Sequence, residues 1–193
     1  EQVARAKQVA ARRTPRAVEE VLYVGRLSRD KNVDVLVRAL AHSALADCPL
    51  RLTVLGDGPE RQSLGQLVTE LGIAERVTFA GAVPFDGVLD HYERADVLVL
   101  ASESEGWPKA IAEAMAFGML CIGSDRGLVP QMLGEGRGRV VPPRDVEALA
   151  GTLAAVAGDA RWTYGAGQRA AEWAQHYSLS GLREALRALM RHT

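Results

Sequence analysis

The chain has 193 residues, with 23 Lys and Arg against 24 Asp and Glu, 48% apolar residues and two cysteines. This length is enough to bury a core without disulfides or metals, in one large domain or two small ones. A net charge of −1 argues against bulk binding to nucleic acid and to anionic lipid surfaces. Cys48 and Cys121 are too few and too far apart for a disulfide framework or a Cys-based zinc site. No apolar run approaches the roughly 20 residues that cross a bilayer, and no secretory pattern opens the chain. We therefore expect a reduced, cytoplasmic, globular protein.

The first residues are unusually basic and begin at Glu1 instead of Met. Five of the first 16 residues are basic: Arg5, Lys7, Arg12, Arg13 and Arg16. This start looks like that of a segment cut from a longer chain. Lysine is otherwise rare, and the two remaining lysines, Lys31 and Lys109, fall inside the motifs described below. A lysine among so many arginines can mark a place that needs a compact, flexible ammonium.

Short β-rich runs alternate with helical patterns along the rest of the chain. The strand candidates are apolar almost throughout, as parallel strands covered on both faces should be: Val21–Gly25, Leu50–Leu55, Val77–Ala80, Val97–Ala101, Leu120–Gly123 and Arg139–Val141. The helical patterns lie between and after them: Val33–Ala44, Glu60–Leu71, Phe85–Arg94, Pro108–Phe117 and Val146–Ala157.

Repeated β-α-β units with short connections predict an α/β fold, a doubly wound parallel sheet of about six strands with right-handed crossovers. The sheet domain is expected over residues 19–158. Residues 159–193 then form C-terminal helices, at Arg161–Gln175 and Leu182–Met190. We expect this tail to pack against something outside the sheet.

The unusual residues gather after the predicted strands. Each of the five loops that follow the first five strands contains glycine, and four of them carry charges. Because ligands of open α/β sheets bind beyond the carboxyl ends of the strands, a composite ligand site is expected there. Loops also need Gly and Pro simply to turn, so no single loop carries this prediction.

The first and fourth loops carry the most specific chemistry. Arg26 and Lys31 precede a helix, where a diphosphate would suit an arginine fork and a lysine beside free N–H groups; the alternative is two solvated basic residues. Pro108 is expected at the first position of a helix, whose N-terminus suits a phosphate or an oxyanion. Glu113 lies in the otherwise apolar stretch that follows, so we expect its carboxylate to be partly buried and partnered, for example by sugar or ribose hydroxyls. Trp107 either stacks on a ligand or wedges the loop.

Other chemistries fit the sequence poorly. The segment Gly56-Asp57-Gly58 opens like a dinucleotide fingerprint, but Arg61 replaces the third glycine and the motif follows the second strand. The chain has no Walker A sequence and no Gly-x-Ser-x-Gly elbow. Its four histidines are scattered without metal-ligand spacing. We therefore predict no metal site and no resident cofactor.

Taken together, six motifs resemble family 4 of the retaining GT-B glycosyltransferases. They occur in the order of that family's C-terminal domain: Gly25-Arg26-x4-Lys31, Gly56-Asp57-Gly58-Pro59, Val77-x-Phe79-x-Gly81, Ser104-Glu105-Gly106-Trp107-Pro108-Lys109, Glu113-Ala114-Met115-Ala116-x-Gly118 and Val141-Pro142-Pro143-x-Asp145. The resemblance implies a Rossmann-like half of a GT-B fold. It also implies a site for a nucleotide-diphosphate sugar, used as the donor without a metal.

The resemblance also assigns roles to individual residues. Arg26 and Lys31, after Gly25, would hold the diphosphate, and Glu105 would contact hydroxyls of the donor sugar. Backbone N–H groups from Gly106 through Trp107 and Pro108 to Lys109 would support the sugar and the distal phosphate. Glu113 would bind the ribose, and the main chain at Phe79, Gly81 and Val83 would flank the base. Stabilising the leaving diphosphate with positive charge suits glycosyl transfer, because negative charge develops there.

Three departures from the family pattern are visible. Asn32 stands where the family usually has glycine, Met119-Leu120 replaces a common x-Pro, and Gly127-Leu128-Val129-Pro130-Gln131 replaces Gly-Gly-x-x-Glu. These changes spare the diphosphate and ribose contacts but affect those on the sugar and acceptor side.

The resemblance covers only the donor half of such an enzyme. The acceptor half would precede residue 1, residues 1–18 would be the linker that enters from it, and the helices of residues 159–193 would pack toward it. The acceptor is therefore unknown, and any membrane contact is expected only through that half. We expect this chain alone to bind a donor but to transfer little or no sugar. The arginine and alanine bias suggests a bacterial source. Two alternatives stay open: a non-catalytic nucleotide-sugar-binding or regulatory module on the same fold, and an unrelated doubly wound enzyme such as a dehydrogenase or epimerase.

Overall fold

A computed structural model describes residues 2–105 and 107–176. Its centre is a six-stranded sheet in the order β3-β2-β1-β4-β5-β6, in which all neighbouring strands are parallel. Each strand lies within one residue of its predicted bounds: β1 Glu20–Val24, β2 Arg51–Leu55, β3 Val77–Gly81, β4 Val97–Leu100, β5 Leu120–Ser124 and β6 Gly138–Val141. The predicted doubly wound sheet is confirmed.

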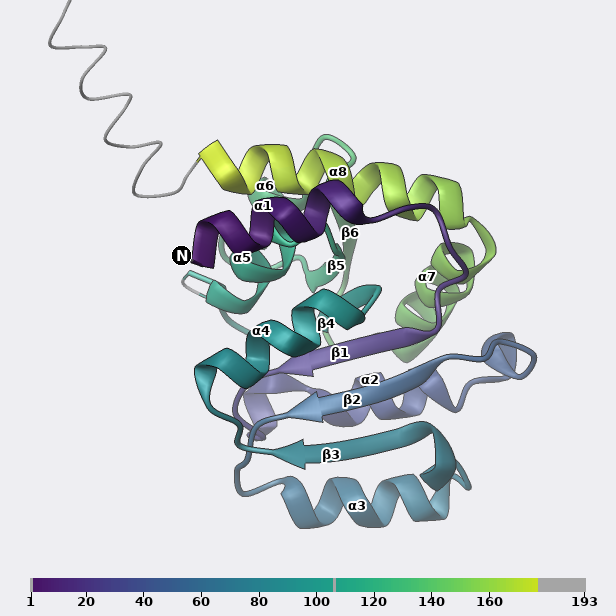
Figure 1. Ribbon diagram of the computed structural model, residues 1–193. Helices are drawn as coiled ribbons and strands as arrows, with labels where there is room; N and C mark the ends of the chain where they lie inside the picture. Colours follow the sequence, from purple (N-terminus) through teal and green to yellow (C-terminus); the bar gives the residue numbers. More distant parts are fainter. Residues whose placement is uncertain (1, 106, 177–193) are drawn as a thin grey trace, which may run out of the picture.

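Helices cover both faces of this sheet. The described α-helices are α1 Gln2–Arg12, α2 Val33–Leu40, α3 Arg61–Glu70, α4 Phe85–Arg94, α5 Lys109–Ala116, α6 Val129–Leu133, α7 Val146–Gly158 and α8 Ala160–His176. Figure 1 shows α4 in front of the strands and α2 behind them, and α2 packs against α3 and α7. The central strands β4 and β5 are buried along their whole length, as their continuous apolar sequence requires.

The outer strand β3 is less covered than predicted. Val77 and Phe79 are half-buried, whereas Thr78 and Ala80, which point to the other face, are exposed. This alternation has the period of two that an edge strand with one solvated face shows.

The helix α2 is shorter than the predicted Val33–Ala44. It ends at Leu40, and a separate 3₁₀ turn follows at Ser43–Leu45. The His42 side chain accepts a hydrogen bond from the backbone N–H of Ala44 at 3.2 Å. This bond caps the new turn in place of continuing the α-helix.

The basic segment at the start of the chain contains a helix, which the sequence analysis did not predict. Ala6 and Ala10 of α1 are buried, and α1 packs against α5 and α8. Arg5 pairs with Asp90 at 2.6 Å and also with Glu93, both on α4. Several of the basic residues therefore fasten this segment to the domain.

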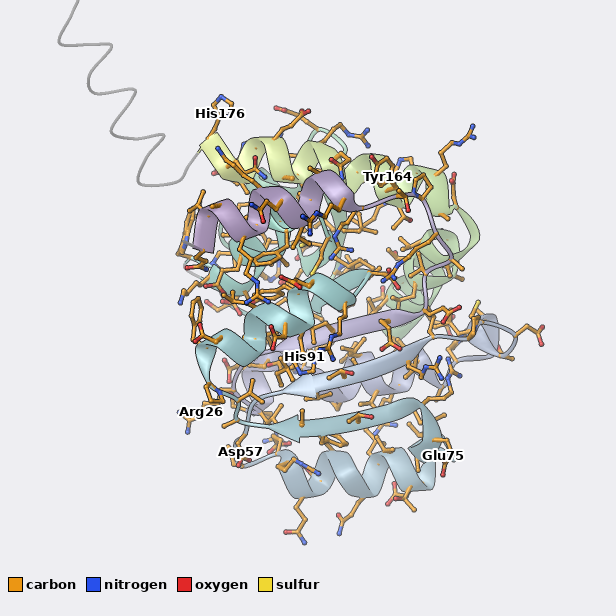
Figure 2. The ribbon with its side chains drawn as sticks, in the orientation of Figure 1. Arg26, Asp57, Glu75, His91, Tyr164 and His176 are labelled. Atoms are coloured by element: carbon orange, nitrogen blue, oxygen red, sulfur yellow. The ribbon has the colours of Figure 1, made fainter. Side chains whose placement is uncertain are left out.

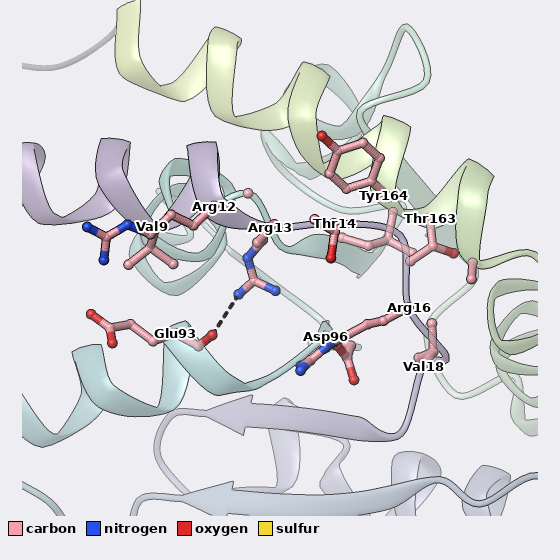
Figure 3. A pocket seen from close by; sticks show the side chains of 13 residues that line it. Val9, Arg12, Arg13, Thr14, Arg16, Val18, Glu93, Asp96, Thr163 and Tyr164 are labelled. Atoms are coloured by element: carbon pink, nitrogen blue, oxygen red, sulfur yellow. Dashed lines mark hydrogen bonds and ion pairs between the residues drawn. The ribbon is translucent and has the colours of Figure 1, made fainter.

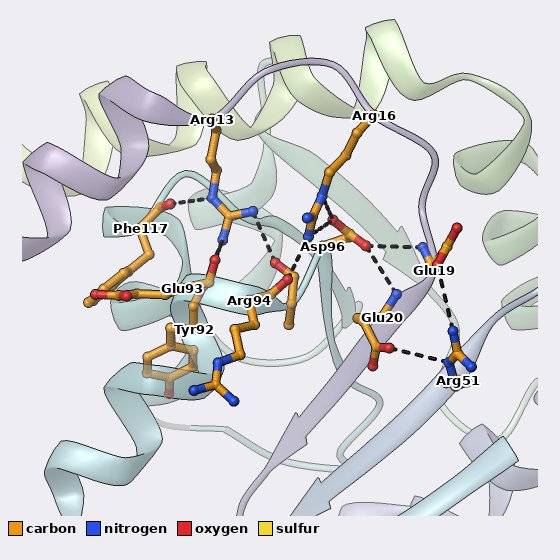
Figure 4. A network of polar contacts seen from close by, with 11 residues as sticks. Arg13, Arg16, Glu19, Glu20, Arg51, Tyr92, Glu93, Arg94, Asp96 and Phe117 are labelled. Carbon is orange, nitrogen blue, oxygen red and sulfur yellow. Dashed lines mark hydrogen bonds and ion pairs between the residues drawn. The ribbon is translucent and has the colours of Figure 1, made fainter. Parts of the chain in front are cut away.

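The connection from α1 to β1 is anchored by two further arginines (Figure 4). Arg13 donates hydrogen bonds to the backbone carbonyls of Phe117, Ala95 and Tyr92 at 2.8, 3.0 and 2.6 Å. Burial lowers the pKa of its guanidinium to about 10. Arg16 pairs with Asp96, whose other oxygen accepts the backbone N–H groups that open β1.

The first helix of the predicted tail, Arg161–Gln175, corresponds to α8. The helix α8 packs against α5 and β5 and so covers part of the sheet itself. The second tail helix, predicted at Leu182–Met190, lies outside the described residues.

Candidate functional site

The loops that were predicted to form a site lie together at the carboxyl edge of the sheet. Figure 2 shows Arg26 and Asp57 beside the arrowheads of the strands, and Glu75 at the opposite edge. Backbone contacts join each of these loops to its neighbour. Main-chain contacts, as well as side chains, therefore hold these loops together as one surface.

Two glycines allow the loops after β1 and β2 to touch. A Cβ atom on Gly56, whose φ is +131°, would lie 1.8 Å from the carbonyl oxygen of Gly25, and one on Gly58 would lie 2.3 Å from that of Leu27. The backbone N–H of Leu27 donates to the Asp57 carbonyl at 3.0 Å. The Gly56 N–H donates to Gly81 at 2.8 Å, which adds the loop after β3. The Gly56-Asp57-Gly58 motif thus packs loops against one another, so no dinucleotide is needed to explain its glycines.

An ion pair joins the loops after β1 and β4. The Lys31 ammonium lies 2.7 Å from Oε1 of Glu105, and the two side chains are only 22% and 12% exposed. Both residues were predicted to contact the donor, but their pairing was not predicted. An ammonium has three N–H donors and a carboxylate has about four acceptor positions. Each partner therefore keeps capacity for a ligand.

Asn32, the departure from the family's glycine, fits the backbone at its position. Its φ of 49° and ψ of 40° are left-handed, a conformation that Asn tolerates better than most residues other than Gly. Its buried side-chain amide donates to the Ala101 carbonyl at 2.9 Å and to Oε1 of Glu103 at 3.0 Å. Asn32 therefore replaces the conformational freedom of glycine with two hydrogen bonds to the loop after β4.

The loops after β4 and β5 are also in close contact. A Cβ atom on Gly127, whose φ is +57°, would lie 1.9 Å from the carbonyl oxygen of Glu105. The Ser124 hydroxyl donates to the Ser102 carbonyl at 2.6 Å. The first glycine of the altered Gly127–Gln131 segment therefore has a steric role, because a side chain there would displace Glu105.

The helix after β4 begins one residue later than predicted. Pro108 is its N-cap and Lys109 its first residue, so Pro108 is not at the first helical position. An N-cap proline still leaves the N–H groups of the first turn pointing out of the helix. Trp107 is 56% exposed, which argues against a buried wedge and leaves the indole free to contact a ligand. Gly106 lies outside the described residues.

Glu113 is half-buried and partnered, as the sequence analysis predicted. Its side chain is 14% exposed, and Oε2 accepts a hydrogen bond from the Tyr92 hydroxyl at 3.1 Å. Burial, followed by the charge of Glu113, raises the pKa of Tyr92, so Tyr92 acts here as a hydrogen-bond donor. Lys109 lies 3.2 Å from Oε1 of Glu113 and also over the Phe85 ring. A pocket of about 190 Å³ opens beside this carboxylate.

The remaining predicted residues differ in what their side chains do. The Arg26 guanidinium is exposed, while its carbonyl accepts the Tyr23 hydroxyl at 2.9 Å. Phe79 lies under the guanidinium of Arg61, at 3.9 Å from the ring centroid, so its ring packs against α3. Gly81 has a φ of +71°, and Val83 packs against the core. Phe79, Gly81 and Val83 would therefore contact a nucleotide base only through main-chain atoms.

A cavity of about 320 Å³ opens at the opposite, amino-terminal edge of the sheet (Figure 3). Its walls include Arg13, Arg16 and Asp96. The backbone carbonyls and the Asp96 carboxylate described above already engage both guanidinium groups. We therefore assign these two guanidinium groups a structural role.

Two features are absent from residues 2–105 and 107–176. In this part of the chain, no three His, Cys, Asp or Glu side chains are grouped in a way that could hold a metal ion. None of the helices in the same part is long and apolar enough to span a membrane.

Most of the chain matches the model of a known protein family. The family model described as "Glycosyl transferases group 1" matches residues 5–171. A curated relative, the D-inositol 3-phosphate glycosyltransferase of Nocardia farcinica, is 33% identical over 174 residues, which are 86% of this chain and 39% of the relative. Across the similar curated relatives, the chain spans between 16% and 45% of their length.

Solved structures share the fold. Sucrose-phosphate synthase from Thermosynechococcus elongatus superposes with a TM-score of 0.78 at 29% identity, over 98% of this chain and 48% of that one. A protein of Anabaena in complex with UDP and glucose gives a TM-score of 0.78 at 21% identity, over 98% of this chain and 53% of that one. Both matches indicate a Rossmann-like domain of the GT-B type.

Proposed function

Because the chain belongs to the group 1 glycosyl transferases, we propose that it is the donor-binding half of a retaining glycosyltransferase of family 4. In this proposal the carboxyl edge binds a nucleotide-diphosphate sugar, and the sugar moves to an acceptor held by another part of a longer protein. Relatives named as glycosyltransferases support the transfer reaction. UDP and glucose in the Anabaena protein support a nucleotide-sugar donor.

One observation carries the proposal: Lys31 and Glu105, 74 residues apart in the sequence, meet at 2.7 Å. The Lys31 ammonium donates to Glu105 and has further N–H donors for phosphate oxygens. In the part of the chain that the structure describes, Oε2 of Glu105 accepts no hydrogen bond that would compete with a sugar hydroxyl. The pair therefore offers a cation to the diphosphate and an acceptor to the sugar at adjoining points.

The chemistry of leaving-group departure fits these groups. Breaking the bond between the sugar and the diphosphate leaves negative charge on the diphosphate, and preorganised positive charge stabilises that state. Arg26, Lys31 and the N-terminus of α5 would supply this charge. The proposal therefore requires no metal ion, and we expect nucleotide binding to be unchanged by a chelator.

Calorimetric titration with UDP, GDP and ADP tests the proposal. We expect at least one nucleotide to bind the wild-type chain, and we expect Arg26→Ala, Lys31→Ala and Glu113→Gln to bind it more weakly. Removing a charge-assisted contact costs about 1.5–3 kcal/mol, so Lys31→Ala is expected to raise Kd by roughly tenfold to a hundredfold.

The matched control is Lys7→Ala, because Lys7 is an exposed lysine on α1. Its affinity is expected to equal that of the wild type. Absence of binding by all three nucleotides, or equal binding by Lys31→Ala and Lys7→Ala, would show that the site assignment is wrong. The bacterial source and the cytoplasmic location stay part of the proposal, and fractionation of the native host tests the location.

A further inference from the structure

Two strained residues from distant loops converge on one carboxylate oxygen. Among the described residues, three that are not glycine have a positive φ: Asn32, Glu135 and Arg144. Two of the three, Asn32 and Arg144, donate hydrogen bonds to the same atom, Oε1 of Glu103. Left-handed backbone at such residues persists where surrounding contacts hold it. We call Asn32, Glu103 and Arg144 the Glu103 junction.

The Glu103 junction connects three loops of the carboxyl edge. Asn32 directly precedes α2, Glu103 follows β4, and Arg144 lies between β6 and α7. Arg144 is itself held in place, because the next residue, Asp145, caps α7 by accepting the Ala148 N–H at 2.9 Å. The loop after β6 thus reaches the two loops that carry Lys31 and Glu105.

The junction is adjacent to the proposed phosphate contacts. The backbone N–H of Glu103 donates to the carbonyl of Asp30 at 2.8 Å, and Lys31 is the next residue after Asp30. Glu105 lies two residues after Glu103. A shift of Glu103 would therefore change the separation of Lys31 and Glu105.

We propose that Arg144 and Glu103 are positioning residues, which hold Lys31 and Glu105 at the spacing that the donor requires without contacting the donor themselves. The inference rests on the proposed function. The Arg144 and Glu103 side chains are 68% and 31% exposed, and exposed ion pairs contribute little to global stability. The junction therefore acts on local geometry, and its loss changes the site without unfolding the domain.

The test compares three variants with the wild type. Arg144→Gly removes the ion pair and also relieves the left-handed backbone at this position. Arg144→Lys keeps a cation that can reach Glu103. Glu135→Gly is the matched control, because Glu135 also has a positive φ and pairs with Arg137 at 2.6 Å, but in the loop before β6 at the other edge of the sheet.

Hydrogen–deuterium exchange is the first readout, because it needs no ligand. Arg144→Gly is expected to speed amide exchange in peptides covering residues 28–33 and 101–105, with an unchanged melting temperature and unchanged exchange in α8. Arg144→Lys and Glu135→Gly are expected to exchange like the wild type in these two segments. Unchanged exchange in both segments of Arg144→Gly would overturn the proposal.

Calorimetry with the nucleoside diphosphate that binds best is the second readout. Arg144→Gly is expected to raise Kd by about fivefold or more, with Arg144→Lys near the wild-type value. An unchanged Kd in Arg144→Gly would overturn the positioning role. If the wild type binds no nucleotide, the proposed function is wrong, and the exchange experiment alone decides whether the junction holds the two loops.

Discussion

Glu103 illustrates how a residue outside the recognised motifs can shape the site. Hydrogen bonds from Asn32 and then from Arg144 hold the pKa of its carboxyl below the ordinary glutamate range. Because the pKa is lower in the folded protein, the charged Glu103 carboxylate stabilises the fold. This contribution is complete above the pKa of the unfolded state, about 4.3. It is lost as the pH falls through the lower folded pKa.

Carbonyl-detected NMR titration checks this expectation at Glu103. In the wild type the carboxyl is expected to titrate below the ordinary value. In Asn32→Gly, which keeps the left-handed backbone but removes the amide donor, the Glu103 pKa is expected to rise. Equal pKa values in the two proteins would mean that Asn32 does not hold the carboxylate.

At the scale of elements, glycines set the spacing between the site loops. Gly127→Ala would place a methyl group 1.9 Å from the Glu105 carbonyl oxygen, whereas a Cβ on Gly72 would meet no atom within 4 Å. Their φ values are similar, +57° and +68°. The left-handed backbone therefore costs each alanine variant a similar free energy, about 1–2 kcal/mol.

The two variants differ in steric collision: the new methyl group would collide with Glu105 in Gly127→Ala and with no atom in Gly72→Ala. We expect Gly72→Ala to lose about 1 kcal/mol of unfolding free energy and to keep its nucleotide affinity. Gly127→Ala is expected to lose more stability and to bind nucleotide more weakly, because Glu105 must move. Urea unfolding and calorimetry measure the two effects, and equal losses in both variants would remove the steric argument.

The connection between α1 and β1 depends on Arg13. Its guanidinium donates to three backbone carbonyls at the ends of α4 and α5. Arg13→Met would leave those carbonyls without this donor, and hydrogen bonds to charged groups contribute about 1.5–3 kcal/mol each. We therefore expect the free energy of unfolding to fall by about 2 kcal/mol or more.

The neighbouring Arg12→Met is the control for this prediction, because Arg12 is exposed at the last turn of α1. Its free energy of unfolding is expected to stay within about 0.5 kcal/mol of the wild type. Urea denaturation of both variants gives the comparison. A similar loss in both would mean that the net charge of the segment, and not the buried contacts of Arg13, stabilises it.

At the scale of the whole molecule, periodicity predicted most of the fold and part of the site. The strands are apolar runs and α4 has its predicted bounds, Phe85–Arg94, because local patterns determine such elements. The helix α1 was missed because small buried residues, Ala6 and Ala10, carry its packing face among many charges. Its apolar residues do recur at helical spacing, Val3, Ala6 and Ala10, a signal that could have found it.

The parts of the site that were not predicted from the sequence are those that depend on tertiary contacts. Lys31 and Glu105 were each predicted as donor contacts, but a pair 74 residues apart leaves no local pattern. Glu103 and Arg144 were not predicted at all, although two acids in one short loop, Glu103 and Glu105, were visible. The steric role of Gly127 likewise depends on how closely two loops approach.

The length of the chain bears on what it can catalyse. It spans less than half of the curated relatives it resembles, and transfer requires an acceptor as well as a donor site. We expect residues 1–193 to bind a donor nucleotide and to give no measurable sugar transfer to water or to simple glycosides. Turnover of UDP-, GDP- or ADP-sugars by this chain, measured by nucleotide release, would contradict that expectation.

The proposed function requires that a nucleoside diphosphate bind at the carboxyl edge of the sheet. An amide chemical-shift map of the labelled chain, titrated with UDP, GDP or ADP, tests it most directly. We expect the largest shifts at residues 25–32, 79–83 and 105–113. Shifts confined to the amino-terminal edge around Arg13 and Arg16, or no shifts with any of the three nucleotides, would contradict it.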